Sequence, residues 1–157
     1  MIYIVTGEVR TGKSTHVYEW LKNRKDVGGF VSLDDGPLRF LYNAVSREKI
    51  DFQTVNNNEG DVLNIGKFSF HKSSFNKASE WAMDHNKDPQ IKYLVIDELG
   101  KLEIKDEGFN KLIKYLLGNS EKDLIIIIRD YLYEKALTYY NITEHISLNK
   151  NELIRIP

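Results

Sequence analysis

The nine residues from Gly7 to Thr15, GEVRTGKST, constrain this chain more than any other stretch of its sequence. They match the P-loop pattern G-x-x-x-x-G-K-[ST] at every fixed position, and the residues before them, 2–5, are β-branched or aromatic. Apolar residues then recur at Val17, Trp20 and Leu21, which is a helical spacing. The pattern predicts a buried strand, a phosphate-binding loop and a helix. A glycine-rich turn before an ordinary helix is the simpler alternative.

Each fixed residue of this pattern has a chemical role. Gly7 and Gly12 allow the backbone to turn so that successive N–H groups point at phosphate oxygens. The positive end of the following helix favours an anion, Lys13 supplies a charge to the β- and γ-phosphates, and the Ser14 hydroxyl is a ligand for Mg²⁺. The predicted nucleotide-binding residues are Gly7, Glu8, Val9, Arg10, Thr11, Gly12, Lys13, Ser14 and Thr15.

Length and composition narrow the class of protein. The 157 residues predict a single domain, 1–157, with a β-rich insertion at about 28–70. The absence of cysteine excludes disulfides, Cys-ligated zinc and thiol catalysis. A net charge of −1, from 22 basic and 23 acidic residues, indicates neither a dedicated nucleic-acid surface nor a membrane surface. No apolar run is long enough to span a membrane and no signal peptide is apparent, so we expect a cytoplasmic protein.

The pattern of apolar residues predicts alternating strands and helices. Strands are expected at 1–6, 28–33, 38–46, 62–70, 91–97 and 123–130 and within 142–148, and helices at 13–25, 74–85, 109–117 and 131–140. We expect the polar stretch 46–61, which contains Asn56 to Gly60, to be a loop or hairpin tip. This alternation predicts an α/β fold of three layers, with a mostly parallel sheet covered on both faces.

Two local signals refine this picture. The turn residues Asp34 to Pro37 predict an antiparallel hairpin of 30–33 with 38–45, inserted after the first helix. Ser73 or Ser74 is a plausible N-cap for the helix at 74–85, and the pair Gly28-Gly29 is expected to stop the first helix.

A second motif supplies the carboxylates that a P-loop requires. Leu94, Val95 and Ile96 end in Asp97 and Glu98, as expected for a buried strand that carries a metal ligand at its end. Asp97 would meet Mg²⁺ opposite Ser14, directly or through a water. Glu98 is placed to orient or deprotonate an attacking water, which favours hydrolysis over transfer. An ordinary polar strand end is the alternative.

At this point the sequence resembles a known family. GEVRTGKST, the GGF of 28–30 and above all DELGKLE at 97–103 resemble the small P-loop nucleoside triphosphatases of the THEP type, which carry a D-E-[IL]-G-K-[ML]-E signature. IGKFSFHKSSF at 65–75 and NKNEL at 149–153 look like further segments of that family, so the resemblance runs through most of the chain.

The resemblance implies an α/β P-loop fold of the additional-strand, catalytic-glutamate (ASCE) division. It implies Mg²⁺-dependent hydrolysis of nucleoside triphosphates such as ATP and GTP, with little base selectivity. In that fold, strand 124–128 lies between the P-loop strand and the strand that ends at Asp97, so Arg129 would point at the γ-phosphate and act with Lys13 and Glu98 in catalysis. Pairing of Arg129 with a surface carboxylate is the alternative, and Arg10 would reach either phosphate or an adjacent loop.

The sequence also departs from the family pattern. The family's longer arginine-bearing hairpin is shortened here to SLDDGPLRF, in which only Arg39 answers to one of the arginines. Lys150 replaces an arginine near the C-terminus. Lys101 and Glu103 of the signature either pair with each other or position the loop after Glu98.

Two other functions stay open. The insertion at 34–70 could form the acceptor pocket of a nucleotide or small-molecule kinase, although no arginine-rich lid is visible. A nucleotide-binding switch with little turnover is the other possibility. The four histidines, at 16, 71, 85 and 145, have no metal-binding spacing, and the sequence identifies no protein partner.

Overall fold

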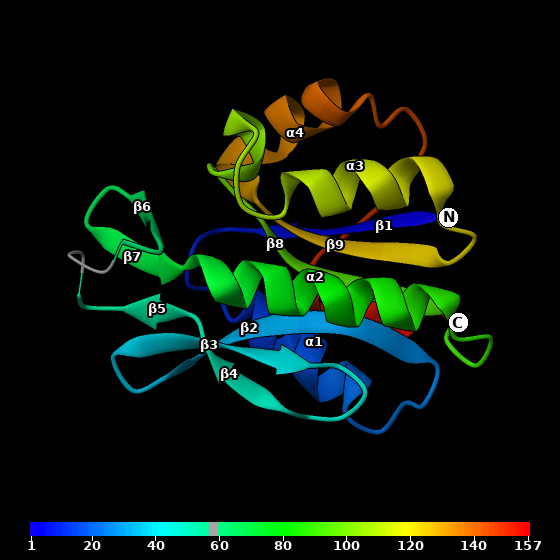
Figure 1. Cartoon of the computed structure of the whole chain (residues 1–157). Coiled ribbons are helices and arrows are strands. Elements are labelled where there is room, and N and C mark those ends of the chain that lie inside the picture. The colour runs from blue at the N-terminus through cyan, green and yellow to red at the C-terminus, as the bar shows by residue number, and fades with distance from the viewer. Residues whose placement is uncertain (57–59) are drawn as a thin grey trace.

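The computed structural model describes residues 1–56 and 60–157, and in this part of the chain seven strands form one main sheet (Figure 1). Their order is β10-β1-β9-β8-β2-β3-β4. The strands are β1 (Ile2–Gly7), β2 (Val27–Asp35), β3 (Leu38–Asn43), β4 (Lys49–Asp51), β8 (Tyr93–Leu99), β9 (Asp123–Arg129) and β10 (Ile146–Leu148). The first five in this order are parallel, whereas β3 pairs antiparallel with β2, and β4 pairs antiparallel with β3. The predicted α/β fold is confirmed, and β9 does lie between β1 and β8.

Helices cover both faces of this sheet. The α-helices are α1 (Lys13–Leu21), α2 (Lys72–Lys87), α3 (Asn110–Asn119) and α4 (Tyr133–Tyr140), and the short 3₁₀ helices are η1 (Glu103–Lys105), η2 (Asp130–Leu132) and η3 (Lys150–Arg155). In Figure 1, α2 and α3 lie in front of the sheet and α1 behind it. None of the described helices is long and apolar enough to cross a membrane.

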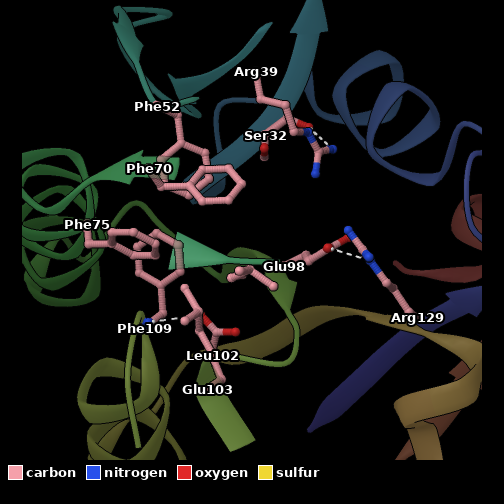
Figure 2. Close-up of a pocket in the computed structure, with 11 residues that line it drawn as sticks. Ser32, Arg39, Phe52, Phe70, Phe75, Glu98, Leu102, Glu103, Phe109 and Arg129 are labelled. Carbon is pink, nitrogen blue, oxygen red and sulfur yellow. Dashed lines mark hydrogen bonds and ion pairs between the residues drawn. The ribbon is translucent and has the colours of Figure 1, made fainter. Parts of the chain in front are cut away.

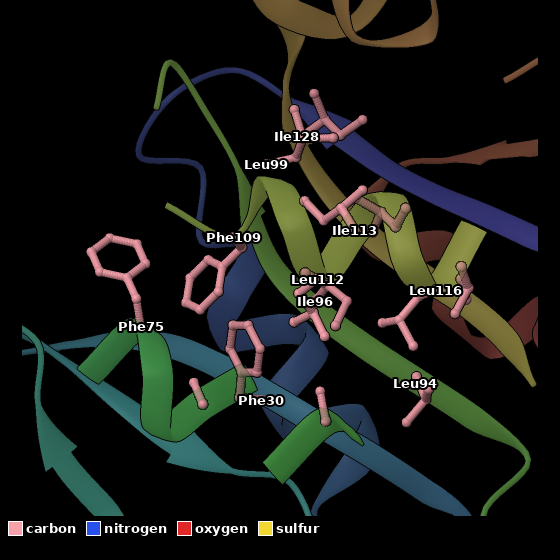
Figure 3. Close-up of a cluster of buried hydrophobic side chains, with 14 of the residues drawn as sticks. Phe30, Phe75, Leu94, Ile96, Leu99, Phe109, Leu112, Ile113, Leu116 and Ile128 are labelled. Carbon is pink, nitrogen blue, oxygen red and sulfur yellow. The ribbon is translucent and has the colours of Figure 1, made fainter. Parts of the chain in front are cut away.

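The two faces contain two separate cores, because side chains alternate along each strand. On β8, Leu94 and Ile96 pack toward α2 and α3, in a cluster that includes Phe30, Phe75 and Phe109 (Figure 3). The intervening residues of β8 pack with α1 and η3 on the other face. Complete burial of one such apolar side chain contributes about 1.5–3 kcal/mol, so both faces hold β8 firmly at the centre.

Gly29 explains why a glycine pair precedes Phe30. Both glycines lie inside β2, and Gly29 has φ 89°. A Cβ added there would lie 1.9 Å from the carbonyl oxygen of Val95 on β8. A Cβ at Gly28 would instead lie 2.6 Å from Cβ of His85 on α2. Helix α1 already ends at Leu21, rather than at 25 as predicted, so the glycines allow β8 and α2 to approach β2 closely and do not end the helix.

The insertion after β2 has more strand structure than predicted. The β2–β3 hairpin is confirmed, with Asp35 opposite Leu38 across the turn. The stretch expected to be loop contains β4 and β5 (Gln53–Thr54), and 62–70 is a hairpin of β6 (Val62–Ile65) and β7 (Phe68–His71) around Gly66. Strands β5, β7 and β6 form a second, antiparallel sheet. The predicted loop residues Asn57, Asn58 and Glu59 lie outside the described residues.

The start of α2 also differs from the prediction. The helix begins at Lys72, directly after β7, so neither Ser73 nor Ser74 is its N-cap. Ser74 instead lies in the first turn, where its hydroxyl donates to the carbonyl oxygen of Asp51. That bond ties the start of α2 to the last residue of β4, at the edge of the main sheet.

Candidate active site

The P-loop connects β1 to α1 as predicted. Gly12 adopts a left-handed conformation, φ 79° and ψ 26°, at the N-cap of α1. No side chain caps this helix end and its first turn carries no acidic residue. Its N–H groups and the positive end of its dipole therefore have no negative side chain of their own, which suits an anionic ligand.

Lys13 lies across the inner side of the loop. Its Nζ donates to the carbonyl oxygens of Gly7, at 2.8 Å, and Glu8, at 2.7 Å, and its side chain is buried. Burial lowers its pKa, while the carboxylates of Glu98, Asp130 and Asp97 raise it. The ammonium group is therefore held near the carboxylates at the end of β8.

The rest of the loop lies nearer to solvent. Thr11 Oγ1 donates to the carbonyl oxygen of Glu8 at 2.8 Å, which closes the turn. Arg10 is exposed and has φ 61°, a conformation that non-glycine residues rarely adopt. Val9 and Thr15 are also exposed. The predicted set is thus contiguous around one loop, with its glycines and Lys13 on the inner side.

Asp97 is completely buried at the end of β8, and only one of its oxygens is used. Its Oδ2 accepts from the backbone N–H of Ser32 at 2.9 Å, whereas Oδ1 has no hydrogen-bond partner. Burial, followed by the charge of Glu98, raises the pKa of Asp97 to about 6; Arg39 and the Ser14 hydroxyl oppose this shift. A buried carboxylate oxygen without a partner, close to a serine hydroxyl, is a donor set that suits Mg²⁺, which prefers oxygen ligands.

Glu98 leaves the regular strand pairing. The pairing of β8 with β9 shifts between Asp97 and Leu99, so Glu98 has no partner in the ladder. A bulge of this kind redirects a side chain and is common beside active sites. Here Glu98 Oε1 accepts from Nε of Arg129 at 2.8 Å, and the Glu98 side chain is only 17% exposed.

Arg129 reaches this position because of strand order. It ends β9 and lies directly opposite Gly7 in the register of β9 with β1, so it lies beside the first residue of the P-loop. The structure thus brings Lys13, from the start of α1, together with Asp97 and Glu98 of β8 and Arg129 of β9. Arg129 thus pairs with Glu98, a largely buried carboxylate at the end of β8, and not with a carboxylate on the surface.

The signature loop after Glu98 is organised by Glu103. Its buried carboxylate accepts from the N–H of Gly100 at 2.8 Å and of Phe109 at 3.0 Å, and burial raises its pKa to about 7 against these two bonds. Lys101 lies 5.8 Å from the ring centre of Tyr131 instead of pairing with Glu103. Of the two predicted alternatives, Glu103 therefore positions the loop.

Sequence reasoning assigned no site role to three residues that the structure places here. The backbone N–H of Ser32 holds Asp97, and Arg39 is close enough to lower the pKa of Asp97. Arg39 lies opposite Asp34 in the hairpin, so counting outward from the turn could have placed it. Lys150 Nζ donates to the carbonyl oxygen of Thr11, which ties η3 to the P-loop.

A pocket adjoins Glu98 on the side of the insertion (Figure 2). Aromatic rings form one wall, and polar groups from β2, β3, β8 and β9 form the other. The lining residues are Ser32, Arg39, Phe52, Ile65, Phe70, Phe75, Glu98, Leu102, Glu103, Phe109 and Arg129.

Comparisons with known proteins agree with this architecture. The model of a family described as NTPase matches residues 2–154. The crystal structure of THEP1 from the hyperthermophile Aquifex aeolicus has a TM-score of 0.76 and 18% identity over 99% of this chain and 94% of that chain. The solution structure of a human cancer-related nucleoside triphosphatase has a TM-score of 0.73 and 20% identity, with the same coverage. At these identities the two structures establish the fold alone. No curated protein sequence matches the chain.

Proposed function

This chain belongs to the NTPase family and is a nucleoside triphosphatase, and from that premise we propose that it hydrolyses NTPs with Mg²⁺ and with little base preference. The observation that carries the proposal is the pair at the end of β8. Asp97 is fully buried with one free oxygen, and Glu98 lies beside it, held by Arg129.

The phosphates would be held by the P-loop. The backbone N–H groups at the start of α1 and the Lys13 ammonium provide positive charge on one side. Lys13 now donates to two loop carbonyls, so its Nζ already lies within the loop and needs no long movement to reach a phosphate oxygen. These groups would contact the phosphates and not the base.

Ser14 and Asp97 would hold Mg²⁺, which supplies positive charge to the β- and γ-phosphate oxygens. The free Oδ1 of Asp97 supports this assignment, because a buried acceptor without a partner is costly unless a ligand satisfies it. The Ser32 N–H fixes the other oxygen, so the carboxylate is oriented before metal binding.

Glu98 would accept the proton of the attacking water. As the water oxygen bonds to the γ-phosphorus, the bond to the β–γ bridging oxygen breaks, and NDP and inorganic phosphate result. Arg129 donates to Glu98 through its Nε and would orient that carboxylate, and its cation would stabilise the negative charge that grows on the γ-phosphate.

Low base preference follows from where the binding groups lie. The binding groups proposed above come from the P-loop, β8 and β9. They would contact only the triphosphate and its metal ion. Because every NTP has the same triphosphate, we expect ATP, GTP, CTP and UTP to be hydrolysed at similar rates.

The test is phosphate release from each of the four NTPs, with Mg²⁺ and with excess EDTA. We expect rates within about tenfold of one another, since the transition-state contacts are shared, and loss of release with EDTA. Lys13→Ala should abolish release, while Lys111→Ala, at an exposed site on α3, is the matched control. Strong preference for one base would contradict the proposed low base preference. Phosphate release in excess EDTA would contradict the proposed dependence on Mg²⁺.

A further inference from the structure

The pocket beside Glu98 has an aromatic wall that the proposed hydrolysis of NTPs does not use. Phe52 and Phe70 come from the segment around the second sheet, and Phe75 comes from the start of α2. Their rings pack with centres 4.8–4.9 Å apart, and Phe109 lies 4.8 Å from Phe75. In Figure 2 these rings face Glu98 across the pocket.

Buried polar groups that lack a hydrogen-bond partner line the opposite wall of the pocket. Ser32 is 1% exposed, and its Oγ has no hydrogen-bond partner. Arg39 Nε is also without a hydrogen bond, although it lies 3.1 Å from Asp34 Oδ1 as an ion pair. Leaving a buried hydroxyl or N–H unsatisfied is costly, so groups like these indicate a place for a polar ligand atom.

The charges around the pocket favour a neutral ligand. Arg129 is paired with Glu98 and Arg39 with Asp34, and Glu103 accepts two backbone hydrogen bonds. An added carboxylate would lie against Glu98, and an added ammonium against the two guanidinium groups. A hydroxyl can accept from Arg39 and bond to Ser32 without adding charge.

The free space sets the size of such a ligand. It is about 60 Å³. One water needs about 10–15 Å³ by the same measure, so the space suits a molecule of about four to six non-hydrogen atoms.

We propose that this pocket binds a small alcohol with an apolar body, and that its hydroxyl can replace water as the acceptor of the γ-phosphoryl group. The proposal rests on the proposed function, since it uses the same Glu98. The body lies against the phenylalanine rings, and the hydroxyl lies between Ser32 and Glu98. The alcohol oxygen bonds to the γ-phosphorus, the bond to the β–γ bridging oxygen breaks, and Glu98 takes the hydroxyl proton. The products are a phosphate monoester and NDP.

The experiment measures how the phosphoryl group divides between butan-1-ol and water. The protein is incubated with Mg²⁺, ATP and butan-1-ol, and ³¹P NMR gives the ratio of butyl phosphate to inorganic phosphate. We expect a ratio above that of the alcohol and water concentrations. Because it is a ratio within one sample, a change in total turnover cancels.

Variants of residues that line the pocket test whether transfer to the alcohol takes place there. Ile65→Trp fills the pocket from its rim and should lower the ratio at least tenfold, while Val55→Trp adds the same ring at a site 83% exposed and should not change it. Ser32→Ala keeps the backbone bond to Asp97 and removes only the hydroxyl, so it should lower the ratio about fivefold, the effect of one hydrogen bond. Ser32→Ala also tests the location of the pocket if the Ile65→Trp variant does not fold.

Each other result has a definite meaning. Phosphate release with ester at or below the concentration ratio overturns the acceptor pocket and leaves the hydrolase intact. A high ratio that Ile65→Trp and Ser32→Ala leave unchanged overturns the location. Butanoate at equal concentration should not lower the ratio, and a clear drop would show an anion site instead. If neither product forms, the proposed function fails as well.

Discussion

Glu103 should make the stability of this protein depend on pH in a way that one substitution removes. Burial raises the pKa of its carboxyl group from the ordinary 4.5 to about 7. In the folded state the group therefore keeps its proton at a pH where the unfolded chain has lost it. Its contribution to stability is fully present below pH 4.5 and is lost as the pH rises through about 7. At about 1.4 kcal/mol per pH unit, the loss is about 3 kcal/mol.

Glu103→Gln removes the titration and keeps the shape. The glutamine oxygen can accept one of the two backbone N–H groups, but its own NH₂ then faces the other, at a cost of about 1–2 kcal/mol at every pH. We therefore expect the variant to be less stable than the wild type at pH 5, and as stable or more stable at pH 8.5. The difference between the two proteins should change by about 2–3 kcal/mol over this range.

Urea unfolding followed by tryptophan fluorescence measures this difference, because Trp81 is buried and reports on the core. Glu107→Gln, an exposed change in the same loop, is the control and should follow the wild type. Parallel stability curves for wild type and Glu103→Gln would refute the reasoning, because they would mean that Glu103 titrates alike in both states.

Three further results are expected. Gly29→Ala should cost more than about 3 kcal/mol in the free energy of unfolding, because its Cβ would overlap the carbonyl oxygen of Val95, and chemical denaturation measures this. Gly118→Ala, in helix α3 with no atom within 4 Å of the new Cβ, should instead stabilise by about 0.5–1 kcal/mol. Arg129→Ala should lower kcat about 10²–10³-fold with a small change in nucleotide affinity, measured by phosphate release and nucleotide titration; an unchanged kcat would remove Arg129 from the transition state.

The sequence predicted those parts of the fold that depend on local pattern. The P-loop has fixed letters, and strands β1, β8 and β9 are long apolar runs, so the boundaries of each were predicted within about two residues. Strands β4 and β5 have three and two residues, too few to show alternation, and their chain was predicted as loop. The predicted N-cap of α2 was wrong because Ser74 forms a hydrogen bond with Asp51, which is distant in the sequence, and local sequence rules do not describe such a bond.

The same division applies to the candidate site. Lys13, Asp97 and Glu98 belong to motifs, and their proximity follows from the shared edge of a parallel sheet. Ser32 belongs to no motif, and Arg39 was matched only to an arginine of the family's hairpin. Both come near Asp97 only because β2 pairs with β8 and β3 folds back on β2. Their contacts depend on strand register and on the depth of each side chain, which a single sequence does not state.

The most direct test of the central claim is Glu98→Gln, with ATP binding and phosphate release measured on the same preparation with Mg²⁺. The amide keeps the size of the side chain but cannot accept a proton from water. We expect ATP to bind with nearly unchanged affinity and phosphate release to fall at least 10²-fold. Release at the wild-type rate would contradict the assignment of Glu98 as the group that activates water.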